Sequence, residues 1–83
     1  MYEVIVQTSA RKQIKKLKKV YQETFISIFL ELKEDPYIGK PLTRELTGKY
    51  SYRFGVYRII YTVNKKQKVI NITTAGHRSS VYK

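Results

Sequence analysis

Three short runs of β-branched and aromatic residues in the second half of the chain constrain the fold more than any other feature. The runs span residues 50–54, 57–63 and 69–75. Only a turn at Gly55 and a polar turn over residues 64–67 separate them. Strands joined by turns this short pair as antiparallel neighbours. Because side chains alternate along a strand, Ile59 and Tyr61 are expected on one face and Arg58 on the other. The sequence therefore predicts an antiparallel meander of three strands.

The first half of the chain predicts one strand followed by two amphipathic helices. Residues 2–8 have a β-branched centre that is typical of a strand, and Ser9 is a favourable N-cap for the helix that follows. Apolar residues then recur at three- and four-residue spacing, in two stripes that meet near Val20. The stripes are Ala10, Ile14, Leu17 and Tyr21 in the first helix, and Phe25, Ile28, Phe29 and Leu32 in the second. Pro36 disfavours further helix, so the second helix is expected over about residues 22–34.

These elements predict an α+β fold with the order β-α-α-β-β-β. A helical hairpin would pack on one face of a small, mainly antiparallel sheet. At 83 residues the chain is expected to form a single domain, residues 1–83. Residues 36–49 contain two prolines and two glycines, so we expect them to be irregular. Helices on one face leave the other face of the sheet open to solvent or a ligand.

The charge of the chain is strongly positive and unevenly distributed. The chain has 17 basic and 6 acidic residues, a net charge of +11, and residues 51–83 contain no acidic residue at all. This excess predicts a polyanionic partner: a nucleic acid, an anionic membrane or an acidic protein. The residues expected to contact nucleic acid are Lys49, Arg53, Arg58, Lys65, Lys66, Lys68, Arg78 and Lys83.

Other classes of protein are disfavoured by what the sequence lacks. Without cysteine there are no disulfides and no thiolate zinc sites, and one histidine with six scattered acids leaves little for a metal site. No apolar stretch reaches the ~20 residues that span a bilayer, and the first residues do not resemble a signal peptide. We therefore expect a cytoplasmic protein with no membrane partner, no metal and no cofactor.

One group of residues at the ends of the predicted strands suits catalysis. The group consists of Arg53, Arg58, His77, Arg78 and Tyr82. RNA can be cleaved without a metal because its own 2′-hydroxyl attacks the phosphate. Arginine forks would stabilise the dianionic phosphorane, and His77 or Tyr82 would transfer protons. Simpler interpretations exist, because strand arginines are usually solvated, a lone histidine is usually structural, and a tyrosine near the end of a chain can simply pack.

Two segments resemble the RelE/ParE superfamily of bacterial and archaeal toxins. Residues 46–61 read LTGKYSYRFGVYRIIY and are similar to the family's run L-x-G…Y-x-x-R-x-G-x-Y-R-I-I-Y. Residues 75–82 read AGHRSSVY and are similar to the family's close x-G-H-R-x-x-V-Y. With length and element order, the resemblance covers essentially the whole chain. In the RelE branch it implies a toxin of a type II toxin–antitoxin system, a ribosome-dependent endoribonuclease that cuts mRNA in the decoding site and stops translation.

The resemblance also implies roles for individual residues. Arg58 and Arg78 match arginines that stabilise the transition state, and Tyr82 matches a tyrosine that orients or stacks on the substrate. Arg53 falls where a basic residue acts as base or phosphate ligand. His77 falls where some relatives have histidine and others lysine.

The chain departs from the best-known family pattern at Ser51. That pattern has two basic residues, two apart, on the strand before Gly55, whereas here only Arg53 remains. Serine has no comparable base function at neutral pH. The identity of the general base therefore stays open, with His77 as a residue that could compensate.

The resemblance further implies a cognate antitoxin, acidic and partly disordered, that wraps the basic surface as it folds. The resulting toxin–antitoxin complex would be able to bind its own operator DNA. Two other functions stay open: a ParE-like toxin that inhibits DNA gyrase without nuclease activity, and a non-catalytic basic domain that binds RNA or DNA. The ParE branch usually lacks the arginine and tyrosine set.

Overall fold

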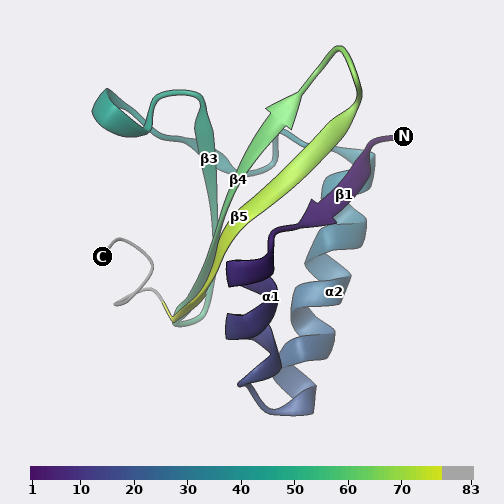
Figure 1. The fold of residues 1–83 in the computed structure, drawn as a ribbon, viewed down its shortest axis with the longest axis vertical. Coiled ribbons are helices and arrows are strands. Elements are labelled where there is room, and N and C mark those ends of the chain that lie inside the picture. The colour runs from purple at the N-terminus through teal and green to yellow at the C-terminus, as the bar shows by residue number, and fades with distance from the viewer. Residues whose placement is uncertain (78–83) are drawn as a thin grey trace.

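The computed structural model describes residues 1–77, within which two helices pack on a five-stranded sheet (Figure 1). The elements in chain order are β1 (Glu3–Val6), α1 (Thr8–Lys15), α2 (Lys19–Glu34), β2 (Lys40–Pro41), a short 3-10 helix η1 (Arg44–Leu46), β3 (Lys49–Phe54), β4 (Tyr57–Asn64) and β5 (Val69–His77). Arg78, Tyr82 and Lys83, which the sequence nominates for the site, lie outside the described residues.

The strand order is β1-β5-β4-β3-β2, with β1 parallel to β5 and the other neighbours antiparallel. The prediction of an α+β fold with a mainly antiparallel sheet is confirmed. The prediction that residues 36–49 are irregular is wrong at β2, because Lys40 pairs with Ser51 and Pro41 pairs with Tyr50. Proline is tolerated here because β2 is an edge strand, where a missing N–H donor leaves no ladder bond unmade.

Both helices cover the same face of the sheet, and the core lies between the helices and that face (Figure 1). The buried apolar residues that form the core cluster are Ala10, Phe25, Ile28 and Leu32 from the helices and Ile59, Tyr61, Ile70, Ile72 and Ala75 from the sheet. The two helical stripes predicted from the sequence are confirmed in part. Four of their residues lie in the core, Ile14, Leu17 and Phe29 pack against it while partly buried, and Tyr21 is 41% exposed. Burial of each isoleucine, leucine or phenylalanine side chain in this cluster contributes about 1.5–3 kcal/mol to the free energy of folding. Neither helix within residues 1–77 is long and apolar enough to cross a membrane.

The start of α1 differs from the prediction. Ser9 is not the N-cap, because the helix begins at Thr8 and Gln7 takes the cap position without a side-chain hydrogen bond. Instead the Ser9 hydroxyl donates to the carbonyl oxygen of Thr73 on β5, at 3.2 Å. The join between the helices also comes earlier than expected: α1 ends at Lys15 and α2 begins at Lys19.

A β-bulge interrupts the pairing of β4 with β5 at Thr73. Ile60 pairs with Thr74, but Tyr61 pairs with Ile72, so Thr73 is one extra residue in β5. Its hydroxyl donates to the carbonyl oxygen of Ile60 at 3.1 Å. An extra residue reverses the alternation of faces along a strand. Before the bulge the even-numbered Ile72 faces the helices, and after it the odd-numbered residues do.

Candidate functional site

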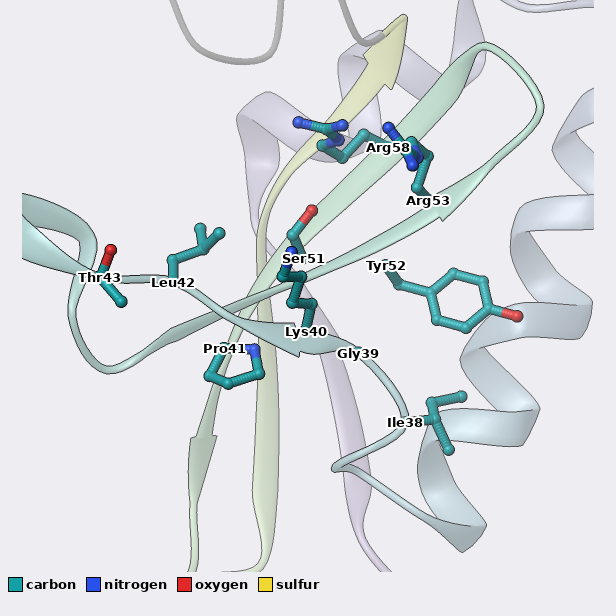
Figure 2. Close-up of a pocket in the computed structure, with 10 residues that line it drawn as sticks. All are labelled: Ile38, Gly39, Lys40, Pro41, Leu42, Thr43, Ser51, Tyr52, Arg53 and Arg58. Carbon is teal, nitrogen blue, oxygen red and sulfur yellow. The ribbon is translucent and has the colours of Figure 1, made fainter.

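The turn between β3 and β4 brings two arginines together on the sheet face away from the helices, here called the open face. Gly55 adopts a φ of 56°, a left-handed conformation that glycine takes at little cost in a two-residue hairpin turn. The register that follows makes Arg53 and Arg58 direct cross-strand partners. Figure 2 shows both guanidinium groups at the same end of one pocket.

The pairing of two permanent cations is unfavourable by itself. Like charges directly opposite on neighbouring strands destabilise a sheet. Arg58 is half-buried, and its Nε atom is fully buried, whereas Arg53 is exposed. A partly buried guanidinium beside an exposed one is an arrangement that favours binding of an anion, which would offset the repulsion.

The pocket beside the arginines has a volume of about 680 Å³. Its lining residues are Ile38, Gly39, Lys40, Pro41, Leu42, Thr43, Ser51, Tyr52, Arg53 and Arg58. Three of these are basic and none is Asp, Glu or His, so among the described residues every charged side chain that lines the pocket is positive. Tyr52 contributes little to its polar surface, because its ring points away toward the helices (Figure 2). Its hydroxyl donates to Glu31 at 3.5 Å, and partial burial together with that carboxylate raises the Tyr52 pKa.

One wall of the pocket is held in place by Tyr61. The hydroxyl of this buried residue donates to the carbonyl oxygen of Pro36 at 2.8 Å and accepts from the N–H of Gly39 at 3.0 Å. Burial raises the Tyr61 pKa to about 12, so the hydroxyl stays protonated and can donate at any physiological pH. A Cβ at Gly39 would lie 2.5 Å from the Tyr61 hydroxyl and 3.0 Å from the carbonyl oxygen of Ser51. Only glycine fits this close approach without displacing β2.

The structure does not bring His77 to the arginine pair. His77 pairs in register with Tyr57, and the two rings are in edge contact with centroids 6.2 Å apart. Tyr57 in turn packs against Tyr21 and Phe25 of α2, at 5.3 and 5.8 Å. His77 therefore belongs to the helix-facing side. The bulge at Thr73 is the physical reason, since uninterrupted alternation after Ile72 would have put His77 on the open face.

The lysines predicted to bind nucleic acid fall into two groups. Lys49 shares the open face with Ser51 and Arg53, at alternate positions of β3. Lys65, Lys66 and Lys68 lie in the turn between β4 and β5, at the other end of the sheet. Lys65 comes seven positions after Arg58, just beyond the end of β4, which is about 24 Å at 3.4 Å per residue. These turn lysines do not line the pocket.

Lys40 is the pocket residue that the sequence reading missed. It pairs with Ser51 on the open face and lines the pocket with both arginines. A two-residue strand leaves no periodicity to detect. The only sequence signal for this residue is its place directly between Gly39 and Pro41, in a segment rich in turn-forming residues.

No group of three His, Cys, Asp or Glu residues within 1–77 is arranged to hold a metal ion. Among the described residues, the lining of the cationic pocket also contains no carboxylate, the side chain through which proteins usually bind Mg²⁺. Its chemistry is that of anion binding.

Comparison with known proteins identifies the family. Residues 4–82 match the family model described as ParE toxin of type II toxin-antitoxin system, parDE. The chain is also 33% identical to Toxin RelG of Mycobacterium tuberculosis over 84 residues, covering 99% of this chain and 97% of that protein. The chain belongs to the RelE/ParE family of type II toxins. This confirms the family resemblance of residues 46–61 and 75–82.

Solved structures of RelE-family complexes share the fold. The toxin in the RelBE2 toxin–antitoxin complex from Mycobacterium tuberculosis matches with a TM-score of 0.86 and 34% identity, over 93% of this chain and 98% of that one. The archaeal RelE–RelB complex from Pyrococcus horikoshii gives a TM-score of 0.77 and 30% identity, over 95% and 97%. The match supports the RelE-like topology described above.

Proposed function

We propose that this RelE-family toxin is a ribosome-dependent mRNA endoribonuclease that inhibits translation in the cytoplasm, without a metal or cofactor. The observation that carries the proposal is the cross-strand pair of Arg53 and Arg58 on a pocket with no carboxylate. Planar guanidinium groups match the oxygens of a phosphodiester, and a phosphate between them would relieve their mutual repulsion.

The reaction we propose uses the substrate's own nucleophile. The 2′-hydroxyl of the RNA loses its proton, and the oxygen attacks the adjacent phosphorus. The bond from phosphorus to the 5′ oxygen breaks, and that oxygen takes up a proton. The products are a 2′,3′-cyclic phosphate and a 5′-hydroxyl end. Arg53 and Arg58 would bind the phosphorane oxygens, where negative charge develops in the transition state.

Two residues outside the described part of the chain complete the proposed site. Arg78 would supply a further transition-state donor, and Tyr82 would orient the substrate, as the family resemblance implies. We assign no proton transfer to His77, because its ring contacts Tyr57 on the helix-facing side.

The ribosome is part of this proposal because the pocket is poor in proton-transfer groups. None of the lining residues within the described part of the chain is a histidine or a carboxylate. Charge stabilisation by arginine does not by itself align the 2′-hydroxyl with the phosphorus and the leaving oxygen. Alignment contributes several powers of ten in rate and would come from mRNA held in the decoding site. Naked RNA should be cut poorly.

An acidic, partly disordered antitoxin is the second proposed partner, and the complex would bind its operator DNA. A groove of about 440 Å³ lies between β1, α1 and Phe29 of α2, with Arg11 and Lys15 at its side. On the outer surface of α2, Ile26 and Leu30 are each 56% exposed and one helical turn apart. An amphipathic acidic segment would cover such apolar surface and neutralise the flanking cations. Relatives from Mycobacterium tuberculosis and Pyrococcus horikoshii crystallised as the RelBE2 toxin–antitoxin complex and as a RelE–RelB complex.

The test is 5′-end mapping of one mRNA in a cell-free translation reaction, with and without ribosomes. The wild-type toxin would be compared with Arg53→Ala, Arg58→Ala and a matched control, Lys12→Ala, which removes one exposed charge from α1. We expect discrete, ribosome-dependent cuts that Lys12→Ala preserves. The Arg58→Ala variant should cut about 10²–10³-fold more slowly.

Two other outcomes would contradict the proposal in different ways. Intact mRNA with normal protein synthesis would exclude the nuclease and favour the ParE-like alternative, to be checked by gyrase supercoiling. Intact mRNA with blocked synthesis would indicate a ribosome binder without chemistry, with Ser51 the first residue to examine.

A further inference from the structure

We propose that Lys40 binds the backbone phosphate next to the scissile one and so sets the register of the RNA in the pocket. This inference rests on the proposed nuclease function and adds a substrate-binding residue that neither the motifs nor the comparisons assign. It starts from the position of β2, a strand two residues long that places a third cation on the open face.

The register of the sheet arranges the three cations in two rows. Lys40 lies opposite Ser51, and Arg53, two residues further along β3, lies opposite Arg58. Two residues of antiparallel strand span about 7 Å. That separation is comparable to the distance between successive phosphates of an extended single strand. The row that contains Lys40 is therefore offset from the arginine pair by about one nucleotide.

The chemical character of the cations separates their tasks. Arg58 is half-buried with its Nε atom fully buried, so its guanidinium group has less freedom to reorient than an exposed side chain. Lys40 is exposed and carries a compact charge on a flexible side chain. Such a group is better suited to binding a phosphate of the unreacted substrate than to matching the geometry of the transition state. Figure 2 shows the Lys40 side chain directed across β3 beside Ser51, along the same side of the pocket as the arginines.

The strand that carries Lys40 is anchored rather than free. Tyr61 fixes the segment just before it through the carbonyl oxygen of Pro36 and the N–H of Gly39. The Gly39 backbone lies so close to Tyr61 that no side chain fits there. A phosphate contact from a short edge strand can fix the position of the RNA only if the strand itself is held in place. The contacts of Tyr61 hold it in place.

The test separates binding from chemistry. Ribosomes programmed with one labelled mRNA would be mixed with excess toxin, and the cleavage rate constant would be measured against toxin concentration. Lys40→Gln should raise the half-saturating concentration about 10-fold while leaving the rate at saturation within about 3-fold. Lys40→Arg, which keeps the charge, should restore the wild-type concentration dependence. Lys12→Gln, the matched charge loss on α1, should change neither value.

Several results would overturn the inference. An unchanged half-saturating concentration for Lys40→Gln would show that Lys40 does not bind the substrate. A loss confined to the saturated rate would place it at the transition state instead. Failure of Lys40→Arg to restore binding, with folding unchanged by circular dichroism, would exclude a charge contact. If the wild-type toxin cut no mRNA, the proposed function would fail and this inference would fall with it, a result distinct from the other three.

Discussion

The close approach of Gly39 to Tyr61 makes a quantitative prediction about how the wall of the pocket is held. Gly39→Ala would place a methyl group 2.5 Å from the Tyr61 hydroxyl and 3.1 Å from the Tyr61 Cε1 atom, with the Ser51 carbonyl oxygen at 3.0 Å. Neither the ring of a fully buried tyrosine nor the backbone of β3 can move aside freely. Overpacking of this kind costs about 1–3 kcal/mol.

Tyr61→Phe perturbs the same contact from the other side. It removes the acceptor of the Gly39 N–H and the donor to the Pro36 carbonyl oxygen. At about 1 kcal/mol for each hydrogen bond, plus the cost of leaving backbone groups unsatisfied, we expect a loss of about 2–3 kcal/mol. A protein of this size has a free energy of unfolding of about 4–12 kcal/mol, so both single variants should remain folded.

The double variant carries the decisive information. Because Tyr61→Phe deletes the oxygen with which the new methyl group collides, the two costs should not add. We expect the double variant to be about 1–2 kcal/mol more stable than additivity predicts. Urea unfolding of the wild type, the single variants and the double variant would measure this coupling. Tyr50→Phe combined with Gly39→Ala is the matched control, since it removes a hydroxyl from the ring stacked on Tyr61 and should be additive. Additivity of the Gly39 and Tyr61 variants within 0.5 kcal/mol would refute the reasoning.

Two further predictions concern charge and pH. Arg53→Gln should raise the stability of the free toxin by about 0.2–1 kcal/mol at low salt, because it relieves repulsion from Arg58 across the hairpin. Thermal unfolding would measure this, high salt should erase the difference, and a less stable variant at low salt would contradict it. Burial raises the Tyr61 pKa to about 12 from an ordinary value near 10. The native state therefore binds the Tyr61 hydroxyl proton more tightly than the unfolded state does. The contribution of this hydroxyl to the free energy of unfolding is complete below pH 10 and is lost as the pH rises from 10 to 12. The stability difference between the wild type and Tyr61→Phe should shrink over that range, and a pH-independent difference would show that the hydroxyl does not titrate as described.

The parts of the fold that the sequence predicts are those with repeated patterns. Phe25, Ile28 and Leu32 recur at helical spacing, and all three are buried against the sheet. The β-branched runs around Ile59 and Ile72 alternate as strands do, and the short turns between them fix their antiparallel order. Several residues contribute to each of these signals, so one atypical residue does not hide them.

The features that the sequence does not reveal each depend on one or two residues. The β2 strand has only Lys40 and Pro41, and its position depends on a tyrosine more than twenty residues away. The bulge is a single extra residue, Thr73, and no local composition marks it. That residue decides on which face His77 lies. Two of the five predicted site residues, Arg53 and Arg58, therefore follow from the register of the hairpin, whereas the position of His77 does not.

The most direct test of the central claim uses a mapped cleavage position in a single mRNA. That mRNA would be prepared with and without one 2′-hydroxyl, on the nucleotide 5′ to the cut, and loaded on ribosomes with wild-type toxin, Arg58→Ala or Lys12→Ala. We expect wild-type toxin and Lys12→Ala to leave a 2′,3′-cyclic phosphate on the hydroxyl-bearing mRNA and no product on the deoxy version. Arg58→Ala should cut about 10²–10³-fold more slowly. Equal cleavage of the deoxy mRNA, or full activity of Arg58→Ala, would contradict the account that the arginine pair stabilises attack by the 2′-hydroxyl.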